Sequence, residues 1–327
     1  MAEVIPITGQ GDHQASCRAL TTSGRRCRNR VTGSDGYCGV HRRPRREAPP
    51  DADRLGGLLR FVRRRLTGEY EVDEFGFDPE LTEEVLAPLA RFFHRRWWRV
   101  DWIGLENVPS TGAALLVSNH AGTLPWDALM MKFGVLDEHP AHRHVRLLAA
   151  DLAFEMPFVG AQARKSGNTL AAADDAFRLL DRGQVLGVFP EGFKGVGKPW
   201  RQRYKLQRFG RGGFIEIALR ARCPIVPVSI VGSEEIYPMI HNAKTMARLF
   251  GFPYFPITPF FPWLGPLGMI PLPSKWIVEF GPPISTDDFP VDAWQDPITV
   301  FEMTDRVREE IQQALDRNVM TRRSVFF

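Results

Sequence analysis

The chain has 327 residues, of which 44% are hydrophobic and 24% charged, and its formal net charge is +4. This length and hydrophobic content are enough for one large domain with an appendage. Residues 1–50 contain nine arginines and four acids, so the excess positive charge belongs to this segment and the rest of the chain is not strongly basic.

The sequence contains no segment that predicts secretion or a membrane-spanning helix. Residues 1–14 lack an apolar stretch after a basic start. Residues 249–273 are uncharged, but they include seven prolines, which a spanning helix cannot accommodate. We therefore expect a cytoplasmic protein that lies peripherally on the inner face of the cell membrane.

Residues 1–50 predict a small metal-binding module followed by a linker. Cys17, Cys27, Cys38 and His41 offer four zinc ligands, and the Cys-x-x-His end resembles a small structural zinc module with three Cys and one His. The alternatives are an Arg-rich tail with incidental cysteines, or disulfides, which a cytoplasmic setting disfavours. Nucleic acid is not an expected partner, because an ordinary solvated surface explains the arginines at least as well.

Residues 51–98 predict an amphipathic helical region. Apolar residues recur at helical spacing from Leu55 to Leu66, with arginines around the other side. This helix either lies on an anionic membrane or docks on the domain. An acidic loop over residues 68–79 and a helix over residues 80–98, interrupted or started at Pro88, should follow.

The third region, residues 99–327, carries the chemistry. A buried strand over residues 113–118 stops at Asn119 and His120, and a helix opens at Pro125 with Asp127 in its first turn. A carboxylate near a histidine fixes the tautomer of the imidazole, as a general base requires. Alone, this pattern is weak evidence for catalysis.

A second buried strand, residues 185–188, ends close to Glu191 and Gly192. Because ligands of open α/β sheets bind beyond the carboxyl ends of the strands, both strand ends should lie at one edge. Between them we expect a strand over residues 145–149, a loop over 154–168 that contains Lys165, and a helix over 170–181 ended by Gly183.

Several cations follow Gly192, beginning with Lys194 and ending with Arg208. They suit a phosphate or the anionic groups of a donor. Beyond them we expect a helix over 210–222, an inert buried Cys223, a strand over 224–228, a last strand over 275–280 and a closing helix over 296–317. The proline- and aromatic-rich residues 249–273 either wall an acyl tunnel, dip into lipid or form a packed loop.

Three ordered blocks resemble the glycerolipid, or lysophospholipid, acyltransferases: Asn119-His120 with Asp127, Phe189-Pro190-Glu191-Gly192, and a Pro-Ile-Val-Pro-Val strand over residues 224–228. The resemblance spans about residues 95–285. It implies an α/β fold with a mixed, mostly parallel central sheet flanked by helices. It also implies a donor, acyl-CoA or acyl carrier protein, and a lipid acceptor, with no cofactor for catalysis.

The resemblance assigns His120 and Asp127 as the base pair. It places substrate binding at Asn119, Gly122, Glu191, Gly192, Lys194 and, weakly, Lys165. Two departures stand out. Six residues separate His120 from Asp127 where the commonest form has four, a spacing that resembles mono- and diacylglycerol acyltransferases. Phe193-Lys194 also replaces the Thr-Arg of many members, which puts phosphate recognition in doubt.

The leading expectation is therefore acyl transfer to a lysophosphatidate-type hydroxyl. The first alternative is transfer to a neutral lipid alcohol, a mono- or diacylglycerol. The second alternative is a non-catalytic lipid-binding protein or a zinc-dependent adaptor. Binding alone requires neither the His/Asp pair nor the Phe-Pro-Glu-Gly end, so the residues favour an enzyme.

Overall fold

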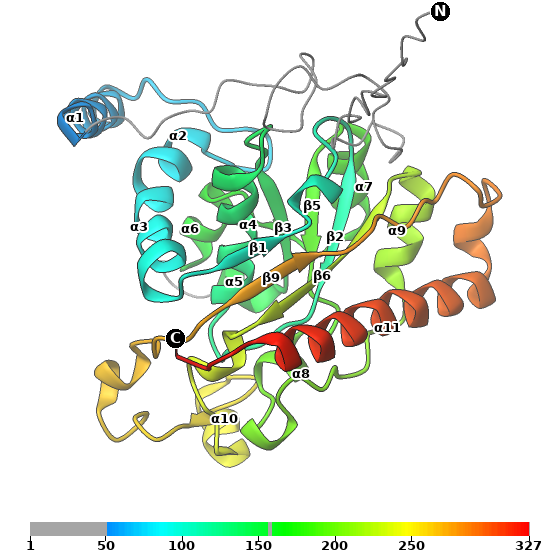
Figure 1. Cartoon of the computed structure of the whole chain (residues 1–327). Helices are drawn as coiled ribbons and strands as arrows, with labels where there is room; N and C mark the ends of the chain where they lie inside the picture. The colour runs from blue at the N-terminus through cyan, green and yellow to red at the C-terminus, as the bar shows by residue number, and fades with distance from the viewer. Residues whose placement is uncertain (1–50, 156–158, 327) are drawn as a thin grey trace, which may run out of the picture.

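The computed structural model describes residues 51–155 and 159–326. Its centre is a seven-stranded sheet in the order β1-β9-β6-β2-β5-β3-β4 (Figure 1). The strands are β1 (Asp101–Ile103), β2 (Ala114–Ser118), β3 (Val145–Ala149), β4 (Thr169–Leu170), β5 (Val185–Val188), β6 (Ile225–Val231) and β9 (Ile277–Phe280). Neighbouring strands pair in parallel except β6 and β9, which confirms the predicted mixed, mostly parallel sheet.

Helices cover both faces of the sheet, as the continuous apolar runs of its central strands require. Leu115 and Val117 of β2 pack into a core with α7 (Ala173–Asp181), α9 (Gly213–Ala221) and α11 (Pro297–Thr321). Ala114 and Leu116, on the opposite face, pack into a core with α3 (Ala87–Phe92) and α4 (Trp126–Glu138). The alternation along one strand therefore builds two cores.

The helix predicted over residues 80–98 is present and starts slightly earlier. It comprises α2 (Pro79–Leu81), π-helical turns over Thr82–Leu86 and Phe93–Trp97, and α3 between them. Asp78 caps its first turn by accepting a hydrogen bond from the N–H of Leu81, and Pro79 occupies a first-turn position that tolerates proline. Pro88 therefore neither starts the helix nor ends it.

The amphipathic helix is α1 (Asp51–Thr67), and two of its arginines pair with acids of the body of the protein. Arg65 pairs with the buried Asp78, and Arg64 pairs with Glu80. Leu59 and Leu66 stay largely exposed on the same helix. The structure therefore shows a helix docked on the domain through Arg64 and Arg65, with leucines still exposed.

The expectation of a loop over residues 154–168 was wrong. This stretch contains the end of α5 (Asp151–Glu155) and α6 (Val159–Lys165), followed by the short strand β4. A run of small, polar and apolar residues with two glycines lacks a clear helical period, so the helices were not recognised. Cys223 is buried as expected, and burial raises the pKa of its thiol to about 12.

Residues 236–273 form an irregular layer beyond the carboxyl ends of β2 and β6. This layer contains β7 (His241–Asn242), α10 (Lys244–Phe250), β8 (Pro256–Ile257) and a 3₁₀ turn over Gly265–Met269. Figure 1 shows it at the lower left, below the sheet. None of the helices in the part of the chain that the structure describes is long and apolar enough to cross a membrane.

Candidate active site

The predicted strand ends meet at one edge of the sheet. β2 and β5 pair in parallel with Val117 level with Val188, so His120 and Glu191 both lie just past this edge. The short helix α8 (Phe193–Val196) then folds back over the His120 loop. A Cβ on Gly195 would lie 2.5 Å from the carbonyl oxygen of His120, so this contact requires glycine.

His120 and Asp127 form a hydrogen-bonded pair. Nδ1 of His120 lies 2.7 Å from Oδ2 of Asp127. Asp127 is fully buried, and its carboxylate also accepts hydrogen bonds from the backbone N–H groups of Ala121 and Ala128. A carboxylate at Nδ1 favours the tautomer with the proton on Nδ1 and leaves Nε2 as the basic nitrogen. Within the described ranges, no side chain or backbone group hydrogen-bonds Nε2.

The long spacing between His120 and Asp127 is accommodated by two consecutive residues with positive φ. Gly122 has a φ of 95°, and a Cβ there would lie 2.7 Å from the carbonyl oxygen of Ser233. Thr123 has a φ of 63°, which is uncommon for a β-branched residue. The loop therefore reverses sharply enough to return Asp127 to the imidazole. Gly122 is needed for this backbone turn.

The Asn119 side chain hydrogen-bonds the backbone of β6 at Ile230. Its Nδ2 donates to the carbonyl of Ile230 at 3.0 Å, and its Oδ1 accepts from the N–H of Ile230 at 2.8 Å. The side chain is fully buried, and it continues the β2–β6 pairing beyond the end of β2. The Asn119 amide thus faces β6 and fixes the start of the His120 loop.

Glu191 supports the His120 loop from the β5 side. Its Oε1 accepts the backbone N–H of His120 at 2.9 Å, and its Oε2 accepts the N–H of Gln207 at 2.6 Å. The side chain is completely buried. Both oxygens of this carboxylate are therefore used inside the protein, unlike the acceptor-positioning role that the resemblance implies.

A buried cation connects Glu191 to a second buried acid. Nζ of Lys198 lies 3.6 Å from Oε2 of Glu191 and 3.0 Å from Oε1 of Glu234. Burial raises the pKa of Glu234 to about 7, although the Lys198 charge acts in the opposite direction. Oε1 of Glu234 also accepts the N–H of Tyr204. This charge network holds the segment after α8 against the His120 loop.

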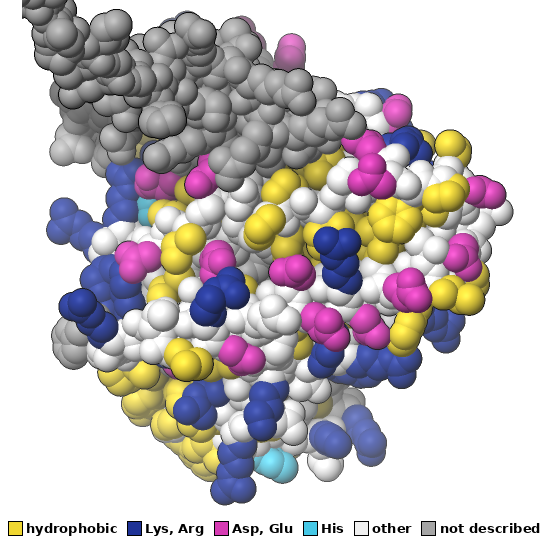
Figure 2. All heavy atoms as spheres, turned by 45° about the vertical axis from the view of Figure 1, so that its right-hand side comes forward, with side chains coloured by type: hydrophobic (Ala, Val, Ile, Leu, Met, Phe, Trp, Pro, Cys, Tyr) yellow, Lys and Arg dark blue, Asp and Glu magenta, His cyan; other side chains and the backbone are white. Residues whose placement is uncertain are grey.

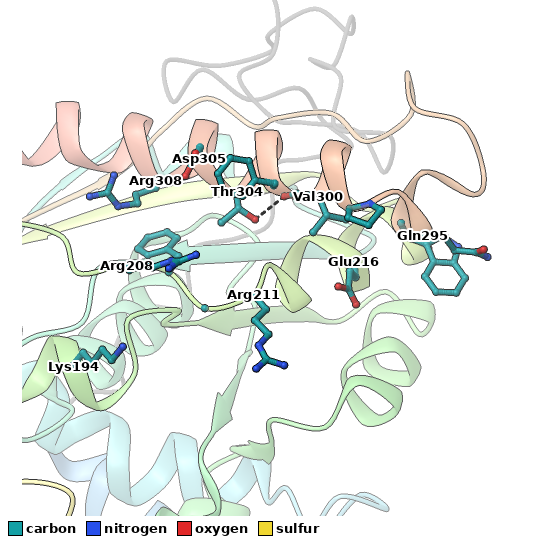
Figure 3. A pocket seen from close by; sticks show the side chains of 14 residues that line it. Lys194, Arg208, Arg211, Glu216, Gln295, Val300, Thr304, Asp305 and Arg308 are labelled. Carbon is teal, nitrogen blue, oxygen red and sulfur yellow. Dashed lines mark hydrogen bonds between the residues drawn. The ribbon is translucent and has the colours of Figure 1, made fainter.

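Gly192 and Lys194 lie on the exposed side of this arrangement. Gly192 has φ 53° and ψ −141°, a backbone conformation that residues other than glycine rarely adopt. Lys194 lines a pocket of about 730 Å³ together with Arg208, Arg211 and Arg308. In Figure 3, Lys194 and Arg208 lie toward one end of this pocket and Gln295 lies at the other. The acids in its lining are Glu216 and Asp305.

Lys165 is not brought to this edge. Its backbone carbonyl accepts the N–H of Asp78, and the following Gly167 carbonyl accepts Nε of Arg146, near the beginning of β3. Since β2, β3 and β5 share one direction, Lys165 lies toward the opposite edge. Cys17, Cys27, Cys38 and His41 lie outside the described residues. Within residues 51–155 and 159–326, no group of acids, His and Cys suits a metal ion.

Two contributors to the site were missed by sequence reasoning. Lys198 belongs to the cationic run after Gly192, but nothing distinguishes it there from its exposed neighbours. Tyr254 lies far along the chain, and its hydroxyl donates to the carbonyl of Thr123 in the His120 loop. Only the tertiary structure reveals these contacts.

Comparison with known proteins agrees with this geometry. Residues 99–231 match the family described as Acyltransferase. An uncharacterized protein of Mycobacterium tuberculosis is 56% identical over 283 residues, which cover 86% of this chain and 79% of that protein. Over residues 99–231 the chain therefore contains an acyltransferase-family domain, and the protein is an acyltransferase enzyme.

More distant similarities extend over much of the chain. A protein of Gallus gallus, named DGAT1/2-independent enzyme synthesizing storage lipids, is 24% identical over 264 residues, which cover 80% of this chain and 72% of that protein. The solved 1-acyl-sn-glycerophosphate (LPA) acyltransferase PlsC from Thermotoga maritima is 20% identical, with a TM-score of 0.49 and coverage of 74% of this chain and 82% of that one.

Proposed function

We propose that the enzyme transfers a fatty acyl group from acyl-CoA or acyl carrier protein to a hydroxyl of a glycerolipid, with a lysophosphatidate-type acceptor. The observation that carries this proposal is the 2.7 Å contact between His120 and Asp127 at the end of β2. This contact leaves Nε2 of His120 free to accept a proton. The family assignment favours an enzyme over a non-catalytic lipid-binding protein or adaptor.

In the proposed reaction, Nε2 of His120 removes the proton from the acceptor hydroxyl as its oxygen attacks the thioester carbonyl carbon. Asp127 stabilises the imidazolium that forms. The tetrahedral intermediate then collapses, the C–S bond breaks, and the imidazolium returns the proton to the thiolate. The products are an ester and a free thiol. The step requires no cofactor and no acyl-enzyme.

The cationic pocket supports a phosphorylated acceptor. Lys194 precedes Gly195, which packs on His120, and Arg208 follows Gln207, which hydrogen-bonds Glu191. Both cations are therefore next in the chain to residues that contact His120 or Glu191. Guanidinium groups bind phosphate with two parallel hydrogen bonds, so Arg208 would supply what the Phe193-Lys194 pair lacks.

A neutral acceptor is the second candidate. The Gallus gallus relative is named for the synthesis of storage lipids, and the spacing of His120 and Asp127 is the long form. In that case the pocket would bind the phosphates of the donor. The two proposals differ in the substrate that binds more weakly when the cations are removed, which is the phosphorylated acceptor in the first case and the donor in the second.

The test is steady-state acyl transfer from palmitoyl-CoA to lysophosphatidate, monoacylglycerol and diacylglycerol. Arg208→Met should raise KM for lysophosphatidate by about tenfold, because the loss of one hydrogen bond to a charged group weakens binding by about this factor. The control is Arg201→Met, which alters an exposed arginine outside the pocket. Activity on the neutral acceptors alone would contradict the lysophosphatidate-type acceptor and leave the neutral acceptor in its place. A raised KM for palmitoyl-CoA with every acceptor would assign the pocket to the donor.

We further propose that the enzyme works peripherally on the cytoplasmic face of the cell membrane. Donor thioesters are delivered from the cytoplasm, whereas a glycerolipid acceptor resides in the bilayer. The prolines of residues 249–273 and the lack of a spanning helix among the described residues support attachment at the surface. Cell fractionation should recover the enzyme with membranes and release it with high salt.

A structural zinc at the N-terminus remains a separate proposal. It rests on the ligand types and spacing of Cys17, Cys27, Cys38 and His41. Metal analysis of the full chain should give one zinc per molecule, and Cys38→Ser should lose it without loss of acyl transfer. Zinc-free protein with unchanged stability would remove this proposal.

A further inference from the structure

Ten large apolar side chains are exposed on the layer formed by residues 236–273. Leu249 is 75% exposed, Trp263 is 73% exposed and Leu267 is 68% exposed. We term the 249–270 surface the six side chains between residues 249 and 270 that are more than half exposed: Leu249, Phe250, Trp263, Leu264, Leu267 and Ile270. The rings of Phe250 and Phe255 stack with their centroids 5.9 Å apart, and the ring centroids of Phe255 and Phe261 are 5.5 Å apart. These ring contacts join α10 to the segment that follows it.

The charged side chains of this segment have one sign. Between Glu235 and Glu279 the chain contains no Asp or Glu. Lys244 and Arg248 are exposed on α10, and in the described part of the chain neither has an acidic partner. Figure 2 shows hydrophobic side chains along the lower left edge of that view, with Lys and Arg beside them. An apolar surface with basic margins is complementary to anionic lipid.

The 249–270 surface is directly connected to the His120 loop. Nε1 of Trp126 donates to the hydroxyl of Tyr237, which donates to the carbonyl of Met269 at 2.6 Å. Tyr254 donates to the carbonyl of Thr123, between His120 and Asp127. A lipid bound at this surface would therefore lie next to the proposed base.

The other exposed apolar stripe, on α1, lies elsewhere. Figure 1 shows α1 at the upper left and α10 at the bottom of the molecule, beyond opposite ends of the sheet. Arg64 and Arg65 are paired with acids of the body, whereas Arg60 and Arg63 are exposed, so α1 also combines exposed leucines with exposed arginines. The leucines of α1 therefore provide a matched control with similar exposure but no connection to the site.

We propose that the 249–270 surface is the membrane-facing surface of the enzyme, and that it binds an anionic phospholipid bilayer. In this orientation the acceptor reaches His120 directly from the lipid. Lys244 and Arg248 lie at the headgroups, while Trp263, Leu264 and Leu267 enter the interface. The delivery of the acceptor rests on the proposed function, but binding to the bilayer does not.

The test is co-sedimentation of the full chain with vesicles of phosphatidylcholine, with and without phosphatidylglycerol. Combined Leu264→Ser and Leu267→Ser should lower the vesicle partition coefficient by about tenfold to a hundredfold, because two side chains no longer bury apolar area. Lys244→Glu with Arg248→Glu should abolish the preference for phosphatidylglycerol. The control Leu59→Ser with Leu66→Ser, on α1, should bind as the wild type does.

Circular dichroism and the unfolding midpoint of each variant check that the fold is intact. Unchanged vesicle binding by the folded 264/267 variant, or loss of binding by the α1 variant alone, would overturn the proposal. So would a dimer in sedimentation equilibrium that only the 264/267 variant disrupts, since a second copy would then cover the surface. These readouts use no acyl transfer, so they stand apart from any failure of the proposed reaction.

Discussion

The carboxylate of Glu191 accepts the backbone N–H of His120 at 2.9 Å from a completely buried position. Glu191, just past the end of β5, therefore positions the His120 loop, just past the end of β2. Through Oε2, the same carboxylate holds the N–H of Gln207. These two bonds explain why a buried carboxylate lies next to the proposed base.

Glu191→Ala should lower kcat much more than it raises KM for the acceptor. The backbone of His120 would lose its partner, and a displacement of the base of about 1 Å can cost about a hundredfold in rate. Glu191→Gln retains an oxygen acceptor and should recover part of the rate. A large rise in KM with unchanged kcat would contradict this account and return Glu191 to acceptor binding.

Lys198→Met should lower the free energy of unfolding by about 3–5 kcal/mol, because it leaves Glu191 and Glu234 buried without their shared cation. Lys205→Met is the matched control, since Lys205 is exposed and has no ion pair among the described residues. Its effect should stay within about 0.5 kcal/mol. Urea unfolding of the three proteins measures both values. Equal stability of the two variants would show that the buried network contributes nothing.

Glu234 should make stability fall with rising pH. Burial raises its pKa from the ordinary 4.5 to about 7 in the folded protein. Between these values the folded chain retains a proton that the unfolded chain releases. The free energy of unfolding therefore decreases with pH in this window, by at most about 1.4 kcal/mol per unit from this group, and the decrease is complete above it.

Glu234→Gln cannot titrate, so it should remove this slope. As the pH rises from about 5 to about 7, the free energy of unfolding of the wild type should therefore fall relative to that of the variant. Denaturant titrations across this range measure the shift. A difference that does not change with pH would show that Lys198 keeps Glu234 ionised throughout.

Asp127→Asn should reduce kcat by about a thousandfold or more, since an amide no longer fixes the Nδ1–H tautomer or stabilises the imidazolium. Oδ1 of Asp127 accepts the N–H of Ala128, and the amide oxygen of Asn can preserve that bond while its NH2 group faces Nδ1 of His120. The fold should survive, and substrate KM should change little. Near-normal turnover would assign Asp127 to loop structure alone.

Much of this arrangement could be predicted from residue patterns. The buried runs that form β2, β3 and β5 were placed correctly, and parallel topology then puts His120 and Glu191 at one edge. The contact of His120 with Asp127 follows from a strand end, a short loop and a helix start. These are local features, and local features are what a single sequence shows best.

The rest depends on contacts between distant segments. The link of Lys198 to Glu234 and that of Tyr254 to Thr123 join residues that no spacing rule relates. The occupation of both Glu191 oxygens by backbone N–H groups is equally invisible before the chain folds. The helices α5 and α6 were missed because their sequence lacks a clear apolar period.

The most direct test of the central claim is acyl transfer from palmitoyl-CoA to lysophosphatidate, measured by free thiol and by the lipid product, for wild type and His120→Ala. The account predicts transfer by the wild type and a loss of about a thousandfold or more in the variant, with the fold intact by circular dichroism. Full transferase activity of the folded His120→Ala protein would contradict the account.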